Sequence, residues 1–287
     1  NEGKSYIPPV GIGEVMRAGG IGRVIASKDP AFAVGDRVSG LLGVQEYCPA
    51  AGALPGGRLE KIDLSLGTPA QWLNVFGMPG MTAYFGLLDI GQPKPGETLV
   101  VSGAAGAVGQ TVGQLAKIKG CRVVGIAGGA AKCDWVVKEL GFDACIDYKG
   151  GSVREGLKQH CPKGVDIYFD NVGGEILDHV LARLAPKARI VICGAISQYN
   201  NTTPMQGPKN YMSLLVNRAR MEGMVVFDHA KQFPQAIAEL AGYIKAGRLK
   251  SKEDIVDGGV SAFPQTLNKL FAGENFGKLV LRVAADN

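Results

Sequence analysis

The chain has 287 residues, enough for two domains of ordinary size, and its formal net charge is +5. Its Lys and Arg residues are scattered, so the sequence contains no basic run of the kind that binds nucleic acid. No apolar run approaches the roughly 18 residues of a membrane helix, and Asn1–Lys4 lacks a leader-like apolar region, so we expect no membrane association.

Cysteine and glycine usage narrows the class of protein further. The six cysteines lie far apart and include no C-x-x-C pair, a pattern typical of reduced thiols in a cytoplasmic protein. The 42 glycines are about twice the usual share and indicate many tight turns and close backbone approaches.

Residues 1 to about 75 contain short β-like pieces separated by turn signals. Gly22–Ser27 and Asp36–Gly43 are the clearest strand candidates, and no strong helix pattern occurs before about Pro69. We expect a small β-rich domain here, to which a C-terminal strand at Phe276–Val283 returns.

From about Val75 to Lys250, strands alternate with helices, which predicts a doubly wound parallel sheet with ligands at the carboxyl ends of its strands. The predicted strands are Thr98–Ser102, Arg122–Ala127, Ala144–Tyr148, Val165–Phe169, Arg189–Cys193 and Met221–Phe227. After the helix that follows the first strand, the predicted helices are Ala131–Leu140, Ile176–Ala185 and Phe233–Ala246. Residues 197–210 form a loop long enough to be a lid or a binding segment.

The stretch after the first of these strands predicts a dinucleotide site. The apolar strand breaks into glycines at Gly103, Gly106 and Gly109, and a helix-period pattern then continues to Gly120. A strand, a glycine turn and a helix together aim unpaired backbone N–H groups and the helix dipole at a phosphate. Three glycines alone can form an ordinary tight turn, but the flanking strand and helix favour the cofactor domain of an oxidoreductase.

The residues after the second strand indicate which nucleotide binds. NAD sites place an acid about 20 residues beyond the glycine turn, where it binds the ribose 2′-hydroxyl. Here no acid occurs before Asp134, and Lys132 is available to a 2′-phosphate, which favours NADP(H) over NAD(H). The alternative is that Lys132 is a solvated residue in the first turn of a helix, where a cation is mildly unfavourable unless an anion offsets it.

Two other kinds of chemistry lack the residues that they need. His160, His179 and His229 are isolated and the cysteines are unclustered, so we expect no metal site. None of the eight tyrosines has a lysine four positions later, so the Tyr–Lys acid–base pair of short-chain reductases is missing. The chemistry that remains is hydride transfer to an electrophile that few protein groups stabilise.

Five ordered segments carry a family resemblance. They are Gly77–Tyr84 (GMPGMTAY), Gly103–Gly109 (GAAGAVG), Phe169–Gly174 (FDNVGG), Cys193–Tyr199 (CGAISQY) and Gly273–Lys278 (GENFGK). On these motifs the chain resembles, over essentially its whole length, the zinc-independent medium-chain reductases of the leukotriene B4 12-hydroxydehydrogenase/prostaglandin reductase type. That family includes plant alkenal double-bond reductases and bacterial curcumin reductases.

The resemblance implies a Rossmann NADP-binding domain over residues 76–251 and a GroES-like β-rich catalytic domain over residues 1–75 and 252–287. It also implies NADPH-dependent reduction of the C=C bond of enones and enals by a homodimer, commonly formed by edge-to-edge pairing of the Rossmann sheets. Family members carry a longer stretch before the segment that matches Tyr6–Val10, so we expect the catalytic domain to be N-terminally incomplete.

The resemblance also assigns residues to parts of the cofactor. The pyrophosphate would be held by Gly106, Ala107, Val108 and Gly109, the 2′-phosphate by Lys132, and the adenosine end would lie against Tyr148. The nicotinamide half would be lined by Asn171, by Cys193, Gly194, Ala195, Ile196 and Ser197, by Met224, Val225 and Val226 on the last strand, and by Asn275. The nicotinamide ring would be supported beside the substrate by Met78, Pro79 and Thr82.

Ordinary structural roles stay open for several of these residues. Asn171 can cap the turn Asn-Val-Gly-Gly, and Tyr148 suits a strand end whatever binds there. Cys193 is expected to be a packed thiol whose backbone, rather than its sulfur, contacts the cofactor.

Tyr199 is the predicted catalytic residue. Hydride delivered to the β-carbon of an enone leaves an enolate, whose oxygen needs a hydrogen-bond donor where the charge develops. The Tyr199 hydroxyl, near the ribose 2′-hydroxyl, would supply that bond directly or through the sugar, with the α-carbon proton coming from solvent. The alternative is a tyrosine that packs the hinge of the lid.

Two rival functions stay open at this point. A zinc-independent NADPH:quinone reductase of the ζ-crystallin type shares the fold and the cofactor, and a catalytically silent NADPH-binding protein belongs to another class. Residues 202–211 are less proline-rich than in the mammalian relatives. Because such loops determine the substrate, the resemblance does not assign the substrate of those relatives to this chain.

Overall fold

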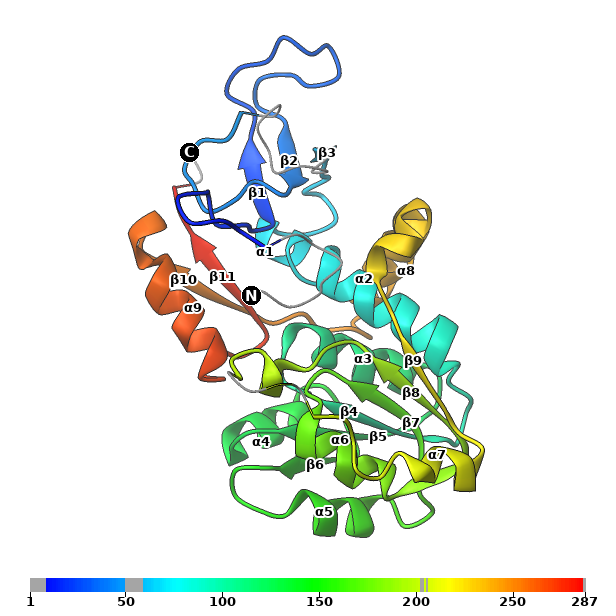
Figure 1. The fold of residues 1–287 in the computed structure, drawn as a ribbon. Coiled ribbons are helices and arrows are strands. Elements are labelled where there is room, and N and C mark those ends of the chain that lie inside the picture. The colour runs from blue at the N-terminus through cyan, green and yellow to red at the C-terminus, as the bar shows by residue number, and fades with distance from the viewer. Residues whose placement is uncertain (1–8, 50–58, 202–203, 205, 286–287) are drawn as a thin grey trace. The chain divides into compact units, whose positions relative to one another are not determined.

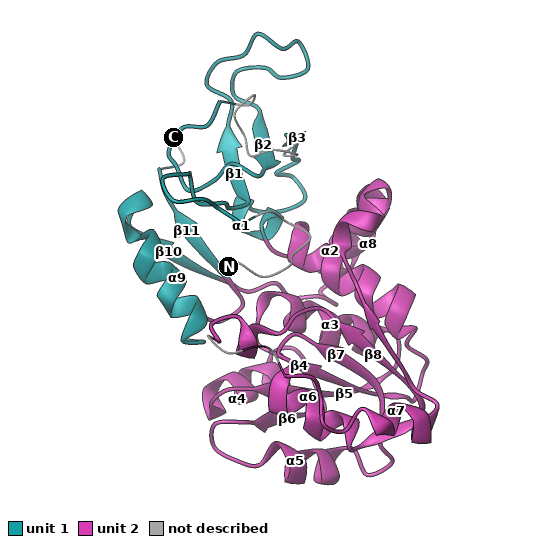
Figure 2. Cartoon of the chain, viewed as in Figure 1, with its two compact units in different colours: residues 1–73, 254–274, 279–287 teal, residues 74–253, 275–278 magenta. Residues whose placement is uncertain are grey.

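The computed structural model describes residues 9–49, 59–201, 204 and 206–285. The chain forms two compact units, which Figure 2 draws in different colours. The first consists of Asn1–Leu73, Asp254–Glu274 and Leu279–Asn287, and the second of Asn74–Glu253 and Asn275–Lys278. The domain bounds expected from the sequence stay a prediction. Tyr6 and residues 202, 203 and 205 of the expected lid lie outside the described residues.

The first unit contains two small sheets. In one sheet, β1 (Gly20–Arg23) pairs antiparallel with β2 (Arg37–Gly40), which pairs antiparallel with β3 (Glu60–Lys61). In the other, β10 (Glu253–Asp257) pairs with β11 (Lys278–Arg282), and each of these strands begins at a residue of the second unit. The helical segments are α1 (Pro69–Trp72), the 3₁₀ turn η5 (Val260–Ala262) and α9 (Phe263–Phe271).

A six-stranded parallel sheet organises the second unit (Figure 1), with the strand order β6-β5-β4-β7-β8-β9. The strands are β4 (Thr98–Ser102), β5 (Arg122–Ala127), β6 (Ala144–Asp147), β7 (Val165–Asp170), β8 (Leu184–Ile192) and β9 (Arg220–Gly223). The α-helices are α2 (Met78–Phe85), α3 (Ala107–Ile118), α4 (Ala130–Lys138), α5 (Val153–His160), α6 (Gly174–Leu181), α7 (Met212–Asn217) and α8 (Phe233–Lys245). The π-helix η2 (Gly86–Gly91) and the 3₁₀ segments η3 (Ile196–Gln198) and η4 (Val226–Gln232) complete the unit. The predicted doubly wound parallel sheet is confirmed.

Both faces of this sheet are covered by helices, with α3 over one face and α5 and α6 over the other (Figure 1). Every residue of β4 is buried, as expected for a strand covered on both sides. Successive side chains alternate between the faces. Tyr168 packs in one buried cluster with Leu157 of α5 and Leu181 of α6. The ring of the next residue, Phe169, lies against Gly86, where an added Cβ would be 2.9 Å from it.

Some predicted element ends are wrong. The helix expected to reach Ala185 ends at Leu181, because Leu184 instead pairs with Val165 in the sheet as the first residue of β8. The last strand of the sheet, expected to reach Phe227, ends at Gly223, although the Met224 N–H still donates to the carbonyl of Ile192. In the first unit, β1 begins two residues before the predicted strand and ends at Arg23 rather than Ser27, and β2 covers only residues 37–40 of the predicted 36–43.

Neither α2 nor α5 was predicted, and nor were α1, α7 and α9. The first, α2, coincides with the motif Gly77–Tyr84 and carries Pro79 in its first turn, where a missing N–H costs nothing. The second, α5, begins after Ser152, whose hydroxyl accepts from the Glu155 N–H as an N-cap. No helix within the described residues is long and apolar enough to cross a membrane.

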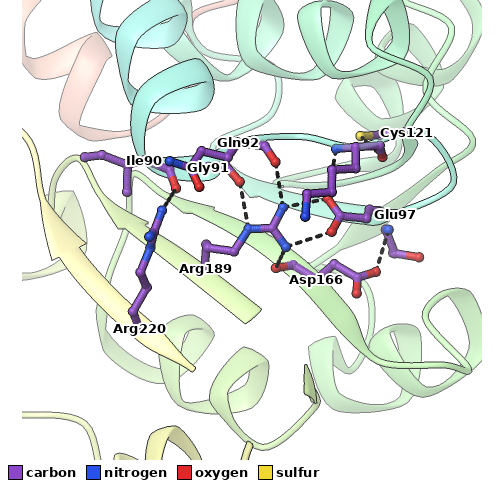
Figure 3. Close-up of polar contacts among 10 residues, drawn as sticks. Ile90, Gly91, Gln92, Glu97, Cys121, Asp166, Arg189 and Arg220 are labelled. Atoms are coloured by element: carbon purple, nitrogen blue, oxygen red, sulfur yellow. Dashed lines mark hydrogen bonds and ion pairs between the residues drawn. The ribbon is translucent and has the colours of Figure 1, made fainter. Parts of the chain in front are cut away.

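Arg189 of β8 ties the sheet to the chain that precedes β4 (Figure 3). Its guanidinium donates to both carboxylate oxygens of Glu97, at 2.9 and 2.6 Å, and to the carbonyl oxygens of Gly91, Gln92 and Asp166. All five of its N–H donors therefore have an acceptor. Burial alone would raise the pKa of Glu97, but the hydrogen bonds from Arg189 hold it below its usual value. This half-buried pair therefore joins β8 to the residue that precedes β4.

Candidate active site

The glycine turn between β4 and α3 fits a diphosphate. Gly103 has a φ of +62°, and a Cβ on Gly109 would lie 2.2 Å from the Gly103 carbonyl oxygen, so glycine is required at both positions. Gly106 is the N-cap of α3, and no side-chain hydrogen bond caps this helix within the described chain. The first N–H groups of a helix have no intrahelical acceptor, so those of residues 107–109 can bind an anion.

The turn between β5 and α4 brings together the residues expected at the adenosine end. A Cβ on Gly128 would lie 2.8 Å from the hydroxyl oxygen of Tyr148, so this ring lies directly on the turn. Gly129, with a φ of +97°, is the N-cap of α4 and donates its N–H to Asp147 at 2.7 Å. Lys132 lies in the first turn of α4 as predicted, with its Nζ 5.5 Å from the ring centre of Phe276.

Asp147 holds this turn and is a residue that sequence reasoning missed. Its carboxylate accepts from the N–H groups of Gly129 and Lys149, and these bonds lower its pKa. An acid is therefore present near the second strand, but it comes from the end of β6 and binds backbone of the turn. Its position directly before Tyr148, at the end of a predicted strand, was the available signal.

The order of strands reverses between β4 and β7, which is where open α/β sheets bind ligands. Asn171 follows β7 at this point. Its backbone N–H donates to the hydroxyl of Ser102, and its side-chain amide donates to the Ser102 carbonyl at 2.8 Å. A Cβ on Gly103 would lie 3.6 Å from the Cβ of Asn171. The glycine turn and Asn171 are therefore neighbours at the reversal.

Asp170, also missed from the sequence, holds the turn that carries Asn171. This side chain is 1% exposed, and its Oδ1 accepts from the N–H groups of Val172 and Gly173 and from the hydroxyls of Ser102 and Tyr168. Its Oδ2 is buried and has no hydrogen-bond partner among the described residues. Burial raises the pKa of Asp170, although these hydrogen bonds act in the opposite direction.

The loop after β8 lies beside that turn. The N–H groups of Cys193 and Gly194 both donate to the Asp170 carbonyl, and the Ser197 hydroxyl donates to the carbonyl of Val172 at 2.6 Å. Burial, and to a smaller extent Asp170, raises the pKa of the Cys193 thiol to about 12. The thiol is therefore neutral at physiological pH and is no nucleophile.

Tyr199 follows η3 in the same loop and folds back over it. Its hydroxyl oxygen accepts the N–H of Ala195 at 3.2 Å, and a Cβ on Gly194 would lie 2.9 Å from that oxygen. The side chain is 53% exposed. Because the phenol oxygen accepts from the backbone, its own hydrogen is available to an acceptor in solvent.

The remaining predicted site residues come from three segments of the chain. Met224 and Val225 follow β9 rather than belonging to it, and Val226 begins η4. Asn275 is buried, and its amide donates to the Gly277 carbonyl, next to the Gly277 N–H that donates to Ala105 in the glycine turn. The three remaining residues lie in the first turns of α2: Met78, Pro79 and Thr82.

The described residues contain no group of three or more His, Cys, Asp or Glu side chains that could hold a metal ion. His179 lies in α6, as predicted from its amphipathic pattern. All six cysteines are free thiols.

Comparisons with known proteins identify the family. A family model described as "Zinc-binding dehydrogenase" matches residues 107–242, and one described as "N-terminal domain of oxidoreductase" matches residues 1–56. The NADPH-dependent curcumin reductase of Escherichia coli (strain K12) is 46% identical over 288 residues, covering 99% of this chain and 82% of that protein. The 2-alkenal reductase (NADP(+)-dependent) of Nicotiana tabacum is 41% identical over 283 residues, covering 98% of this chain and 81% of that protein.

A solved structure agrees with these relatives. The crystal structure of CurA from Vibrio vulnificus in complex with NADPH has a TM-score of 0.91 and 43% sequence identity, and the match covers 99% of this chain and 85% of that one. The fold is thus a Rossmann sheet with a GroES-like β-rich domain, and the protein is an NADPH-dependent oxidoreductase. It belongs to the zinc-independent medium-chain dehydrogenase/reductase family, in the group of the curcumin, alkenal and prostaglandin reductases.

The buried carboxylate of Asp170 yields a pH-dependent prediction. When folding raises the pKa of an acid, ionisation of that acid destabilises the folded state. The contribution of Asp170 to the free energy of unfolding therefore falls as the pH rises from about 4, the ordinary aspartate pKa, toward the raised value. Asp170→Asn keeps an acceptor at Oδ1 and cannot ionise. We expect the unfolding free energy of this variant, relative to the unaltered protein, to increase across that interval, in urea titrations at several pH values.

Asp134→Asn is the matched control, because Asp134 is exposed and pairs only with Lys138 on the same helix in the described contacts. A stability difference for Asp170→Asn that stays constant from pH 4 to pH 8 would contradict the raised pKa, whatever constant offset the amide introduces.

Proposed function

We propose that the protein catalyses the NADPH-dependent reduction of the C=C bond of α,β-unsaturated ketones and aldehydes. The observation that supports this most is the phenol hydroxyl of Tyr199, which lies over the loop at the carboxyl end of β8 with its hydrogen available to a substrate oxygen. The relatives named as curcumin and alkenal reductases support the same class of substrate.

In this proposal the cofactor lies along the carboxyl ends of the strands. The N–H groups of Gly106, Ala107, Val108 and Gly109 bind the diphosphate, and the helix dipole of α3 adds a favourable field. Lys132 binds the 2′-phosphate, and Tyr148 lies against the adenosine end. The nicotinamide half is lined by the segments that meet near the strand reversal: Asn171, Cys193–Ser197, Met224–Val226 and Asn275.

The chain's own part in the chemistry is small. NADPH supplies the hydride when it is bound. Tyr199 donates its hydroxyl hydrogen bond to the carbonyl oxygen of the substrate, on which negative charge develops as the β-carbon gains hydrogen. Met78, Pro79 and Thr82 support the nicotinamide ring beside the substrate, and the proton that completes the α-carbon comes from solvent.

A homodimer formed through the edge strand β9 is part of the proposal. β9 is the last strand of the sheet, and an open edge offers unpaired backbone groups to a second copy. Met212, Leu215 and Val216 of the adjoining α7 are exposed apolar side chains. Sedimentation velocity measures this directly, and a monomer at micromolar concentration would contradict it.

Two further assignments keep their predicted form. We propose that residues 76–251 make the Rossmann domain and that residues 1–75 and 252–287 belong to the GroES-like domain. Limited proteolysis followed by mass spectrometry of the fragments would locate these boundaries. The free state of all six cysteines supports the cytoplasmic location predicted from their spacing, which fractionation of the source cells would test.

The substrate class is tested by the loss of NADPH absorbance with enals, enones and 1,4-quinones, each repeated with NADH. We expect turnover of enones and enals, with a product that has gained two hydrogens at the C=C bond by mass spectrometry. Reduction confined to quinones would instead assign a quinone reductase. NADPH binding without any turnover would assign a catalytically silent binding protein.

Lys132→Met tests how NADPH is distinguished from NADH. A charge-assisted hydrogen bond contributes about 1.5–3 kcal/mol, so we expect the KM for NADPH to rise roughly 10- to 100-fold. The KM for NADH should stay within about twofold, because NADH lacks the 2′-phosphate. Lys138→Met, in the last turn of the same helix, is the control. An equal change for both cofactors would remove the assignment.

Tyr199→Phe tests the catalytic hydroxyl. Removal of one donor to a developing oxyanion should lower kcat on the order of 10²-fold. The Kd for NADPH, from fluorescence titration, should change little, because the ring remains in place. Tyr47→Phe, at an exposed tyrosine to which no role is assigned, is the control. Unchanged turnover in Tyr199→Phe would show that the hydroxyl takes no part in the reaction.

A further inference from the structure

The backbone of Lys252 makes four hydrogen bonds to three other residues. Its N–H donates to the Gln110 Oε1 at 2.9 Å. Its carbonyl oxygen accepts from the Gln110 Nε2 at 3.2 Å, from the Asn74 Nδ2 at 3.3 Å and from the Lys278 N–H at 3.0 Å. We call Lys252 and these three partners the Lys252 joint. All four residues belong to the second unit.

The joint gathers the places where the chain leaves and re-enters the second unit. Asn74 is the first residue of that unit, Lys252 lies one residue before the end of its long segment, and Lys278 ends its short segment. The two hydrogens of the Asn74 amide are shared among three acceptors, because its Nδ2 also lies 3.0 Å from the Ser251 hydroxyl and 2.8 Å from the Glu253 carboxylate. Each point where the chain crosses from one unit to the other therefore lies within a few residues of Lys252 or of a residue that contacts it.

The cofactor helix α3 holds this joint through two buried glutamines. Gln110 and Gln114 are 0% and 4% exposed and lie four residues apart, on one face of the helix. Gln114 repeats the two-bond pairing one turn later, because its amide donates to the Lys250 carbonyl at 2.9 Å and accepts the Lys250 N–H at 2.7 Å. The two amides bind the backbone of residues 250–252 as a neighbouring strand would.

The glycine turn is connected to the same joint. The Gly277 N–H donates to the Ala105 carbonyl at 2.8 Å, and Gly106 and Gly277 form a parallel β-bridge. A Cβ on Gly277 would lie 2.0 Å from the Lys252 carbonyl oxygen, so this passage packs directly on the joint. The Gln110 N–H in turn donates to the carbonyl of Gly106. Residues 105 and 106 of the glycine turn are therefore hydrogen-bonded to two segments that meet at the joint.

We propose that Gln110 is a positioning residue that couples NADPH binding at the glycine turn to ordering of the Lys252 joint. The inference rests on the proposed placement of the diphosphate at residues 106–109. Coupling of this kind is reciprocal, so a variant that loosens the joint weakens NADPH binding by the factor by which NADPH tightens the joint. Gln110 acts through the backbone of Lys252 and touches no reacting atom.

Hydrogen–deuterium exchange of the unaltered protein tests the coupling without activity. We expect NADPH to slow exchange in peptides that cover residues 103–109, 250–253 and 275–278, by roughly fivefold or more at the joint. Protection at 103–109 without protection at 250–253 overturns the coupling and leaves the proposed site intact. Protection at neither segment removes the proposed diphosphate site, and the inference falls with it.

Two variants of Gln110 assign the coupling to this side chain. Gln110→Met keeps the shape and loses both bonds to Lys252, so exchange at residues 250–253 should rise about fivefold, NADPH should no longer restore protection there, and its Kd should rise by a similar factor. Gln110→Glu keeps an acceptor for the Lys252 N–H and should fall between the two. Gln159→Met, an exposed change on α5, is the matched control. Exchange and NADPH response equal to those of the unaltered protein in Gln110→Met overturn the proposal.

Discussion

The close approach of α3 to the end of β4 is the constraint on which the rest of the second unit depends. Gly109 has no room for a side chain against the carbonyl of Gly103, and this contact sets where the helix begins. The helix start then determines where its unpaired N–H groups point and where Gln110 lies one turn later. The proposed diphosphate site and the Lys252 joint therefore depend on one short stretch of backbone.

Two carboxylates at the strand ends bind the backbone of the turns beside them. Asp147 binds the N–H of Gly129 and Asp170 binds those of Val172 and Gly173, so each acid holds the turn at the end of its own or the neighbouring strand. Lys132 is the charged group that the sequence predicts for the adenosine end, which agrees with a phosphorylated cofactor.

The parallel sheet and the glycine turn could be predicted because their signals are local. β4 and β5 have the bounds that the sequence predicts, since both are unbroken apolar runs next to glycine turns. Leu184 was misassigned because an apolar residue fits a helix face and a buried strand equally well, and only its pairing with Val165 decides between them. Asp170 was missed because nothing in its neighbourhood shows that four donors will converge on one oxygen.

The glutamines of α3 show what local pattern cannot supply. The apolar spacing of Val112, Leu115 and Ala116 indicates one buried face, yet the helix is buried continuously from Gly109 to Ala116. A buried amide is tolerated only when its donors and acceptors are paired, and the partners of Gln110 and Gln114 lie 142 and 136 residues further along the chain. An apolar residue of the same size would leave the N–H of Lys252 or Lys250 unpaired. Residues 250–252 and helix α3 therefore constrain each other, although neither sequence alone reveals it.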